Sequence, residues 1–241
     1  MIIKAIGTGS IFSETNSPSY LIDDKILIDI PNGTCKNLKK EAIDLMKIKH
    51  ILLTHFHGDH YFDIPFYLLE QATLIKDDDN NIYIYTSDNG IENIKKLTEL
   101  AFPHTVKKIN NNLNIQYITS DKFNIDGYTI EKILVDHGNM KPAYGYILST
   151  KNYKIGFTGD ASYSEVIEYM ASTCDYLICD CALIKGTNKH MGIDNIISLS
   201  DKYKDCMLYT THMGNDTREE LKKLELKSVK PLSDGETIKL K

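Results

Sequence analysis

The stretch Thr54-His55-Phe56-His57-Gly58-Asp59-His60 concentrates three histidines and one aspartate within a few residues. A single histidine is usually an ordinary core or surface residue, but polar groups packed this densely need a bound partner to be satisfied. Imidazole nitrogen is a good ligand for zinc, iron and manganese. The stretch directly follows the apolar run 50–54, which is typical of a buried strand. It therefore predicts a metal site at a strand end.

The spacing within this stretch predicts that one loop can serve two metals. If the strand stays extended up to His55, the side chains of His55 and His57 point to the same side. Asp59 and His60 follow where a helix is expected to begin, so they turn towards a neighbouring point.

Three further ligand candidates each follow a strand-like run. These are His137 after Ile133–Asp136, Asp160 after Ile155–Gly159, and His212 after Leu208–Thr211. Ligands at strand ends along one edge of a sheet are what a shared site requires. Gly159 also allows a close approach of the backbone before Asp160.

The hydrophobic pattern predicts an α+β protein with two β-rich halves, each carrying helices. Two mixed sheets packed face to face with helices outside are expected, and no low-complexity linker divides residues 1–241, so one domain is predicted. The polar turn 77–81 lacks the ligand spacing of a calcium loop. The expected helices are 36–46, 59–74, 91–101, 164–171, 193–203 and 218–224. The expected strands are 1–6, 19–22, 25–30, 50–54, 82–85, 113–118, 122–125, 128–136, 144–150, 154–158, 176–181, 207–210 and 237–240.

Composition narrows the class of protein. The 241 residues are 42% hydrophobic and 25% charged, which is ordinary for a globular protein. No run approaches the roughly 20 apolar residues of a membrane span, and the N-terminus does not resemble a signal peptide, so a cytoplasmic protein is expected. The net charge of −5 argues against a surface built to grip nucleic acid. Of the five cysteines, Cys179 and Cys181 alternate in an expected strand and are interpreted as core residues, not as a metal pair.

The pattern His-x-His-x-Asp-His, here His55 to His60, resembles the signature of the metallo-β-lactamase superfamily of hydrolases. The resemblance covers nearly the whole chain and implies a four-layer αβ/βα sandwich with a pseudo-twofold relation between its halves. The segments that resemble the phosphodiesterase and tRNase Z branch are Gly7-Thr8-Gly9-Ser10, Ile26-Leu27-Ile28-Asp29, Val135-Asp136-His137, Tyr144-Gly145-Tyr146, Thr158-Gly159-Asp160 and Thr211-His212.

Carried over residue by residue, the resemblance implies two divalent metal ions, with zinc the best fit and manganese or iron as alternatives. One metal would be held by His55, His57 and His137. The other would be held by Asp59, His60 and His212, and Asp160 would bridge both. Two metals about 3.5–4 Å apart can share a hydroxide and generate a nucleophile at neutral pH.

His190, in Lys189-His190-Met191-Gly192, resembles an additional histidine of the phosphodiesterase branch that contacts the phosphate or protonates the leaving group. His190 and Asp59 are therefore the expected catalytic residues. The alternative for His190 is a surface histidine ahead of a helix. Asp180 lies on an expected buried strand, where a carboxylate needs a partner, so it is expected to orient a histidine.

Departures from the family narrow the branch further. Asp160 stands where many true metallo-β-lactamases carry cysteine, and His57 where flavodiiron proteins carry glutamate, so neither antibiotic hydrolysis nor di-iron redox chemistry is expected. The 30 residues from Asp160 to His190 leave no room for the long arm with which tRNase Z grips tRNA. The turn 29–33 and Asp63 also depart from the family pattern, and neither is expected to touch a ligand.

The sequence thus predicts a dinuclear metal-dependent phosphodiesterase that acts on a small or cyclic phosphodiester. Nucleic acid is not an expected substrate, and whether the chain acts alone or as a homodimer stays open. One alternative is a thioester or lactone hydrolase, whose third histidine usually lies in a Gly-His-Thr context that His137 lacks. Another is a non-catalytic nucleotide-binding sensor, against which the complete ligand set argues.

Overall fold

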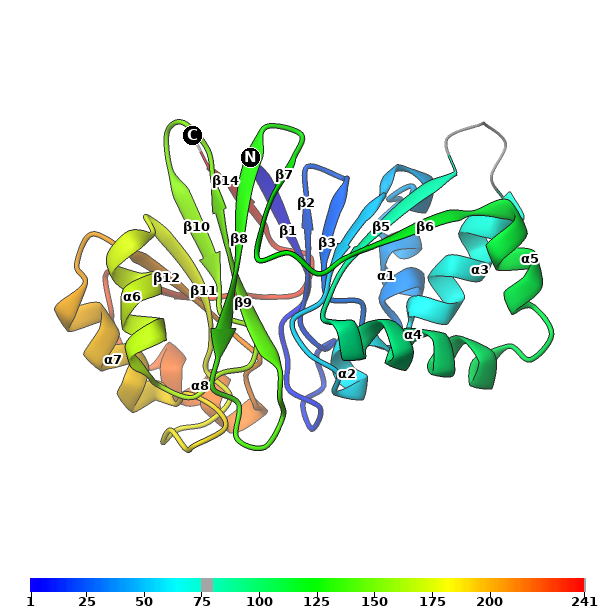
Figure 1. The fold of residues 1–241 in the computed structure, drawn as a ribbon. Coiled ribbons are helices and arrows are strands. Elements are labelled where there is room, and N and C mark those ends of the chain that lie inside the picture. Colours follow the sequence, from blue (N-terminus) through cyan, green and yellow to red (C-terminus); the bar gives the residue numbers. More distant parts are fainter. Residues whose placement is uncertain (75–79, 241) are drawn as a thin grey trace. The chain divides into compact units, whose positions relative to one another are not determined.

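The computed structural model describes residues 1–74 and 80–240, which contain two seven-stranded mixed sheets with helices (Figure 1). The chain divides into two compact units. The first unit comprises Met1–Gly7, Ser17–Thr119 and Asp234–Lys241, and the second comprises Thr8–Asn16 and Ser120–Ser233. The single domain expected from the sequence stays a prediction.

The first unit contains the sheet with strand order β14-β1-β2-β3-β4-β5-β6. Counted from β14, three antiparallel pairings are followed by three parallel ones. Its strands are β1 Ile2–Gly7, β2 Ser19–Ile22, β3 Ile26–Ile28, β4 His50–Leu52, β5 Asn81–Tyr85, β6 Asn114–Ile118 and β14 Thr237–Lys239. Its helices are α1 Thr34–Lys40, a short 3₁₀ helix Leu45–Lys47, α2 Gly58–Tyr61, α3 Ile64–Leu74, α4 Asp88–Ala101 and α5 Val106–Asn112.

The second unit contains the sheet with order β7-β8-β9-β10-β11-β12-β13. Counted from β7, it repeats the same series of three antiparallel and three parallel pairings. Its strands are β7 Lys122–Ile125, β8 Tyr128–Val135, β9 Ala143–Ser149, β10 Lys154–Phe157, β11 Tyr176–Asp180, β12 Met207–Thr211 and β13 Val229–Pro231. Its helices are α6 Glu165–Thr173, α7 Ile193–Lys202 and α8 Asn215–Lys222.

Strand direction decides where functional side chains can gather in the second unit. β10, β11 and β12 are parallel neighbours, so their C-terminal ends reach the same edge of the sheet. β8 is separated from β10 by two antiparallel pairings and therefore runs in the same direction as β10. Residues that follow these four strands are thus brought to one edge.

Each unit has its own hydrophobic core. In the first unit, strand residues such as Leu27 and Ile51 pack with Leu38 of α1 and Tyr67 of α3. In the second unit, Leu177 and Leu208 of the sheet pack with Met170 of α6 and Ile196 of α7. Cys179 and Cys181 are fully buried free thiols in this second core, which confirms their interpretation as core residues.

Most expected elements are present, and the differences have local causes. The helix expected over 59–74 is divided into α2 and α3, because Pro65 lacks an N–H and its ring would clash with the carbonyl of Tyr61 in a continuous helix. The helix expected over 36–46 ends at Lys40, and Ala42 adopts a left-handed backbone conformation with φ 56°. The short elements α5 and β13 were not expected, and the polar turn 77–81 falls largely outside the described residues.

Among residues 1–74 and 80–240, no helix combines the length and apolar character that crossing a bilayer requires.

The core of the first unit predicts a clear contrast between two substitutions. Leu27 is fully buried in β3, so Leu27→Ala should lower the free energy of unfolding by about 2–5 kcal/mol, because it leaves a cavity. Ile2 is 50% exposed at the start of β1, so Ile2→Ala should change it by about 0.5 kcal/mol. Denaturant titration followed by circular dichroism measures both, and equal losses would contradict this assignment of the core.

Candidate metal centre

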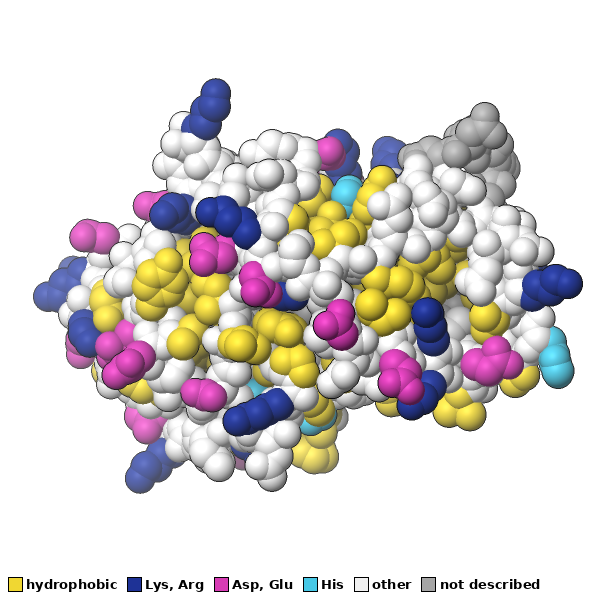
Figure 2. Space-filling view, viewed as in Figure 1, with side chains coloured by type: hydrophobic (Ala, Val, Ile, Leu, Met, Phe, Trp, Pro, Cys, Tyr) yellow, Lys and Arg dark blue, Asp and Glu magenta, His cyan; other side chains and the backbone are white. Residues whose placement is uncertain are grey.

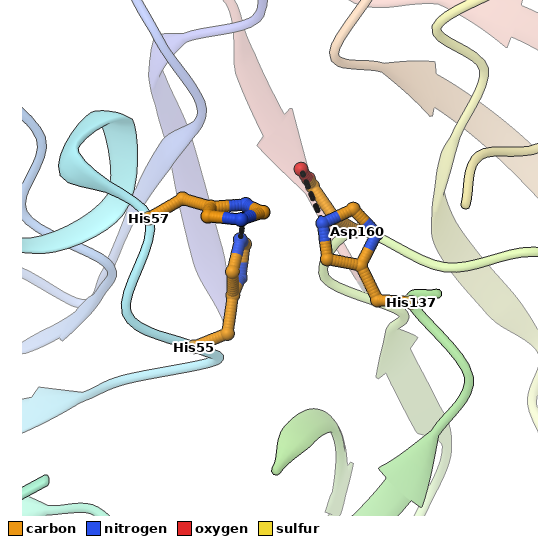
Figure 3. Close-up of side chains that lie close together, drawn as sticks. All are labelled: His55, His57, His137 and Asp160. Atoms are coloured by element: carbon orange, nitrogen blue, oxygen red, sulfur yellow. Dashed lines mark hydrogen bonds and ion pairs between the residues drawn. The ribbon is translucent and has the colours of Figure 1, made fainter. Parts of the chain in front are cut away.

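The histidine-rich segment of the first unit links β4 to α2. Within this segment, His55 and His57 face each other, with His55 Nε2 and His57 Nδ1 3.0 Å apart (Figure 3). The ring of His60 lies against that of His55, with 4.0 Å between the ring centroids. His60 Nε2 lies 3.8 Å from the Oδ2 atom of Asp59. The four donors predicted from this segment therefore form one cluster.

Asp29, directly after β3, holds this cluster in place. Its Oδ2 atom lies 2.7 Å from His60 Nδ1, and its carboxylate also accepts hydrogen bonds from the backbone N–H and the hydroxyl of Thr54. Burial raises the pKa of Asp29, against the opposing effect of His60. With Nδ1 engaged by the carboxylate, Nε2 of His60 is left to face Asp59 and a metal.

The expectation that the turn 29–33 touches no ligand is therefore wrong. The physical reason is the left-handed backbone of Asp29, with φ 56°, at the point where the chain leaves β3 beside the parallel strand β4. The sequence did offer a signal for this contact. Asp29 comes one residue after a buried strand, β3, and the histidine-rich segment leaves the neighbouring strand β4 at the same edge of the sheet. Asp63, the other departure, accepts a hydrogen bond from the backbone N–H of Cys35 in α1.

In the second unit, histidines that follow β8 and β12 lie close to Asp160, which follows β10. Its Oδ2 atom lies 3.4 Å from His212 Nε2 and 3.9 Å from His137 Nε2, the second pair being drawn in Figure 3. His190 Nδ1 lies 4.0 Å from the same oxygen. One ligand atom each from Asp160, Asp180, His190 and His212 can be chosen so that all lie within 4.8 Å of one another.

Asp180, at the end of β11, orients His190. The carboxylate is fully buried, and its Oδ2 atom lies 2.8 Å from His190 Nδ1. The backbone N–H groups of Ala161 and Ala182 donate to its two oxygens, each at 3.0 Å, so the carboxylate cannot rotate freely. This is the kind of role that the sequence predicts for Asp180.

The environment of His190 favours its protonated form. Burial on its own lowers the pKa of His190, but the hydrogen bond and charge of Asp180, together with the charge of Asp160, outweigh burial and raise it. Because Nδ1 is engaged by Asp180, the proton available for transfer lies on Nε2.

His137 has the opposite tendency. Burial lowers its pKa, although the charge of Asp160 opposes this, so the neutral form that a metal ligand requires is favoured. Its Nδ1 atom donates to the backbone carbonyl of Lys189 at 2.7 Å. Nε2 is thereby directed towards Asp160. No pattern in the sequence predicts the contact between His137 and the carbonyl of Lys189.

The donor chemistry of each unit fits a divalent metal ion. Imidazole nitrogens alternate with carboxylate oxygens, a combination that suits zinc and also accepts manganese or iron. In His60 and His137, Nδ1 is hydrogen-bonded to a carboxylate or a carbonyl, while Nε2 faces an aspartate carboxylate. This is typical of metal-binding histidines. These residues could hold a metal, and their assignment as ligands stays a prediction.

Two of the eight histidines lie outside these clusters. His50 opens β4 at the opposite end from the histidine loop, where it stacks on Tyr83 with 4.8 Å between the ring centroids. His104 follows α4 in a left-handed conformation with φ 71°. The structure places neither with the predicted ligands.

Comparison with known proteins supports one family. The family described as "Anti-Pycsar protein Apyc1" matches residues 1–230. Ribonuclease Z of Pyrococcus abyssi is 32% identical over 162 residues, which are 63% of this chain and 49% of that protein. The chain thus spans about half the length of the curated relatives it matches.

Solved structures match over essentially the full chain. YhfI from Bacillus subtilis, a metallo-β-lactamase fold protein, covers 99% of both chains with a TM-score of 0.78 and 18% identity. A diphosphatase of the PhnP family covers 100% of this chain and 98% of its own, with a TM-score of 0.76 and 20% identity. These matches confirm the predicted α+β fold class.

The matched family covers most of the chain, and the clustered histidine and aspartate donors lie within the residues that it matches. The chain belongs to the family of the anti-Pycsar protein Apyc1, is similar to ribonuclease Z over part of its length, and has the fold of the metallo-β-lactamase fold protein YhfI.

Proposed function

We propose that the chain is a dinuclear metal phosphodiesterase that cleaves a small or cyclic phosphodiester. The observation that carries the proposal is the buried Asp180–His190 pair beside Asp160 and His212. This arrangement places an imidazole that is held by a carboxylate among groups suited to metal binding, and P–O cleavage can use such a group as a proton donor at the leaving oxygen.

The proposed ligand set draws on both clusters. One metal would be held by His55, His57 and His137, the other by Asp59, His60 and His212, and Asp160 would be shared by the two. The donor chemistry of each cluster and the family membership support this set. When bound, two divalent metals supply an activated water at neutral pH and neutralise charge on the phosphoryl oxygens.

The protein's own residues would prepare this chemistry. Asp29 and the carbonyl of Lys189 set the tautomers of His60 and His137, so that Nε2 of each is free to bind. Asp59 contributes a carboxylate at the start of α2. Asp180 holds the proton of His190 Nδ1, and His190 would deliver its Nε2 proton to the oxygen of the leaving group.

A ribonuclease and a diphosphatase among the similar proteins favour phosphate chemistry. Other features support a small substrate over a long nucleic acid. Between Asp160 and His190 the chain forms only α6, β11 and the segments that connect them. On the face shown in Figure 2, basic and acidic side chains are interspersed, and the net charge is −5.

A thioester or lactone hydrolase would use the same donors, but its third histidine usually lies in a Gly-His-Thr context that His137 lacks. A nucleotide-binding sensor would bind without hydrolysis. The cytoplasmic location stays a prediction, and a homodimer stays an alternative to a chain that acts alone.

Metal analysis tests the ligand set without relying on activity. Purified protein reloaded with Zn²⁺ or Mn²⁺ should hold two metal ions per chain, and Asp160→Ala should lose at least one, because it removes the proposed bridge. His104 lies outside the clusters, so the control variant His104→Ala should keep both ions. Elemental analysis counts the metals, and metal addition should raise the thermal midpoint of wild type more than that of Asp160→Ala. Unchanged metal content in Asp160→Ala would remove Asp160 from the ligand set.

The role of His190 is tested with two leaving groups. For a diester with an alkoxide leaving group, His190→Ala should lower kcat by about 10²–10⁴-fold, because the departing oxygen then lacks a proton donor. For bis-p-nitrophenyl phosphate the loss should be smaller, since p-nitrophenolate leaves without protonation.

Steady-state assays at equal metal content measure this difference, and His50→Ala serves as the control. Equal losses on both substrates would assign His190 to phosphate contact instead of proton transfer. A metal-loaded, folded wild type that hydrolyses neither diester would refute the phosphodiesterase proposal.

A further inference from the structure

The loop Leu183–Gly192, called here the His190 loop, is held by contacts within the second unit. Its two ends are joined by a parallel bridge between Leu183 and Gly192. Inside it, Thr187 N–H donates to the carbonyl of His190 at 2.8 Å, and Gly186 N–H donates to Asp194 Oδ1 at 2.9 Å. The loop therefore presents its residues in a defined arrangement.

Lys189 is attached to the segment of His137 at two points. Its carbonyl accepts the hydrogen bond from His137 Nδ1 at 2.7 Å. Its aliphatic stem lies along Gly138, where an added Cβ would come within 2.8 Å of Lys189 Cγ and 3.4 Å of Cε. Gly138 has φ +58°, so glycine here meets both the backbone requirement and the space taken by the lysine stem. The ammonium, one bond beyond Cε, therefore lies near Gly138, the residue that follows His137.

Within the described residues, the positive charge of Lys189 is not neutralised by an ion pair. The residue is exposed, and in the described parts of the chain its ammonium forms no ion pair. The neighbouring buried carboxylates, Asp160 and Asp180, already face histidines. A phosphodiester carries a negative charge, so a nearby cation that is not engaged in an ion pair would add to the attraction of the site for it.

We propose that Lys189 is a substrate-binding residue whose ammonium contacts the anionic phosphate of the substrate beside His137 and His190. This inference rests on the phosphodiesterase function proposed above and adds the residue that recruits the anion. A lysine suits this task because its ammonium is a compact charge on a long stem, and here the stem is already held against Gly138. Since the charge acts before and during binding, it should affect KM more than kcat.

Lys189→Gln is the decisive variant, because it removes the charge and leaves the backbone carbonyl that orients His137. KM for bis-p-nitrophenyl phosphate should rise about three- to tenfold, the range expected for loss of one charge near an anion in a partly aqueous site. The value of kcat should stay within about twofold, since no proton or ligand is lost. Added salt should raise KM of the wild type more than that of the variant, and Lys189→Arg should restore most of the loss.

Lys185→Gln is the matched control, because Lys185 is an exposed lysine of the same loop without the contacts to Gly138 and His137. It should leave KM and kcat unchanged. An equal rise in KM in both variants, or no rise in Lys189→Gln at equal metal content, would overturn the proposal.

Direct binding separates this proposal from the proposed function. Titration of metal-loaded protein with inorganic phosphate in a calorimeter needs no turnover, and Lys189→Gln should weaken its affinity about three- to tenfold. If wild type hydrolyses no phosphodiester, the function fails while the phosphate titration still tests Lys189. Equal phosphate affinities in wild type and Lys189→Gln would reject the role of Lys189 whatever the activity.

Discussion

The common direction of β8, β10, β11 and β12 is the constraint on which the candidate site of the second unit depends. Because these strands end at one edge, His137, Asp160, Asp180 and His212 come together although up to 75 residues separate them along the chain. Backbone hydrogen bonds maintain the alignment beyond the strands: Ser162 N–H donates to Asp136 carbonyl, and Cys181 N–H donates to Thr211 carbonyl. A fold with another strand order would scatter the same residues.

The hydrogen bond that each histidine makes through Nδ1 fixes the orientation of its ring and leaves Nε2 for a metal or a proton. Asp29 engages His60, Asp180 engages His190, and a backbone carbonyl engages His137. At His190 the combined effect of Asp180 and Asp160 outweighs burial and raises the pKa, whereas at His137 burial dominates and lowers the pKa. The same side chain can therefore serve as a proton donor at one position and as a metal ligand at another.

The two sheets repeat one series of pairings, and the repeat relates their acidic residues. Asp29 follows β3 and Asp160 follows β10, and each of these strands makes the first parallel pairing of its sheet. In the first unit the carboxylate supports a histidine, while in the second it faces three histidines. One architectural position thus carries a supporting residue in one unit and a proposed metal bridge in the other.

The donor types, their placement at strand ends and most of the elements could be predicted from the sequence, because hydrophobic periodicity and ligand spacing are local properties. The partner of each donor could not be predicted, because it depends on how distant segments of the chain meet in the fold. The contact of Asp29 with His60 depends on a left-handed residue, and that of His137 with the carbonyl of Lys189 joins residues 52 positions apart. Pro65 is a local signal for the division of the helix expected over 59–74, whereas the hydrogen bond from Cys35 N–H to Asp63 joins residues 28 positions apart. Such contacts depend on how loops bring distant residues together, and no local sequence pattern predicts that.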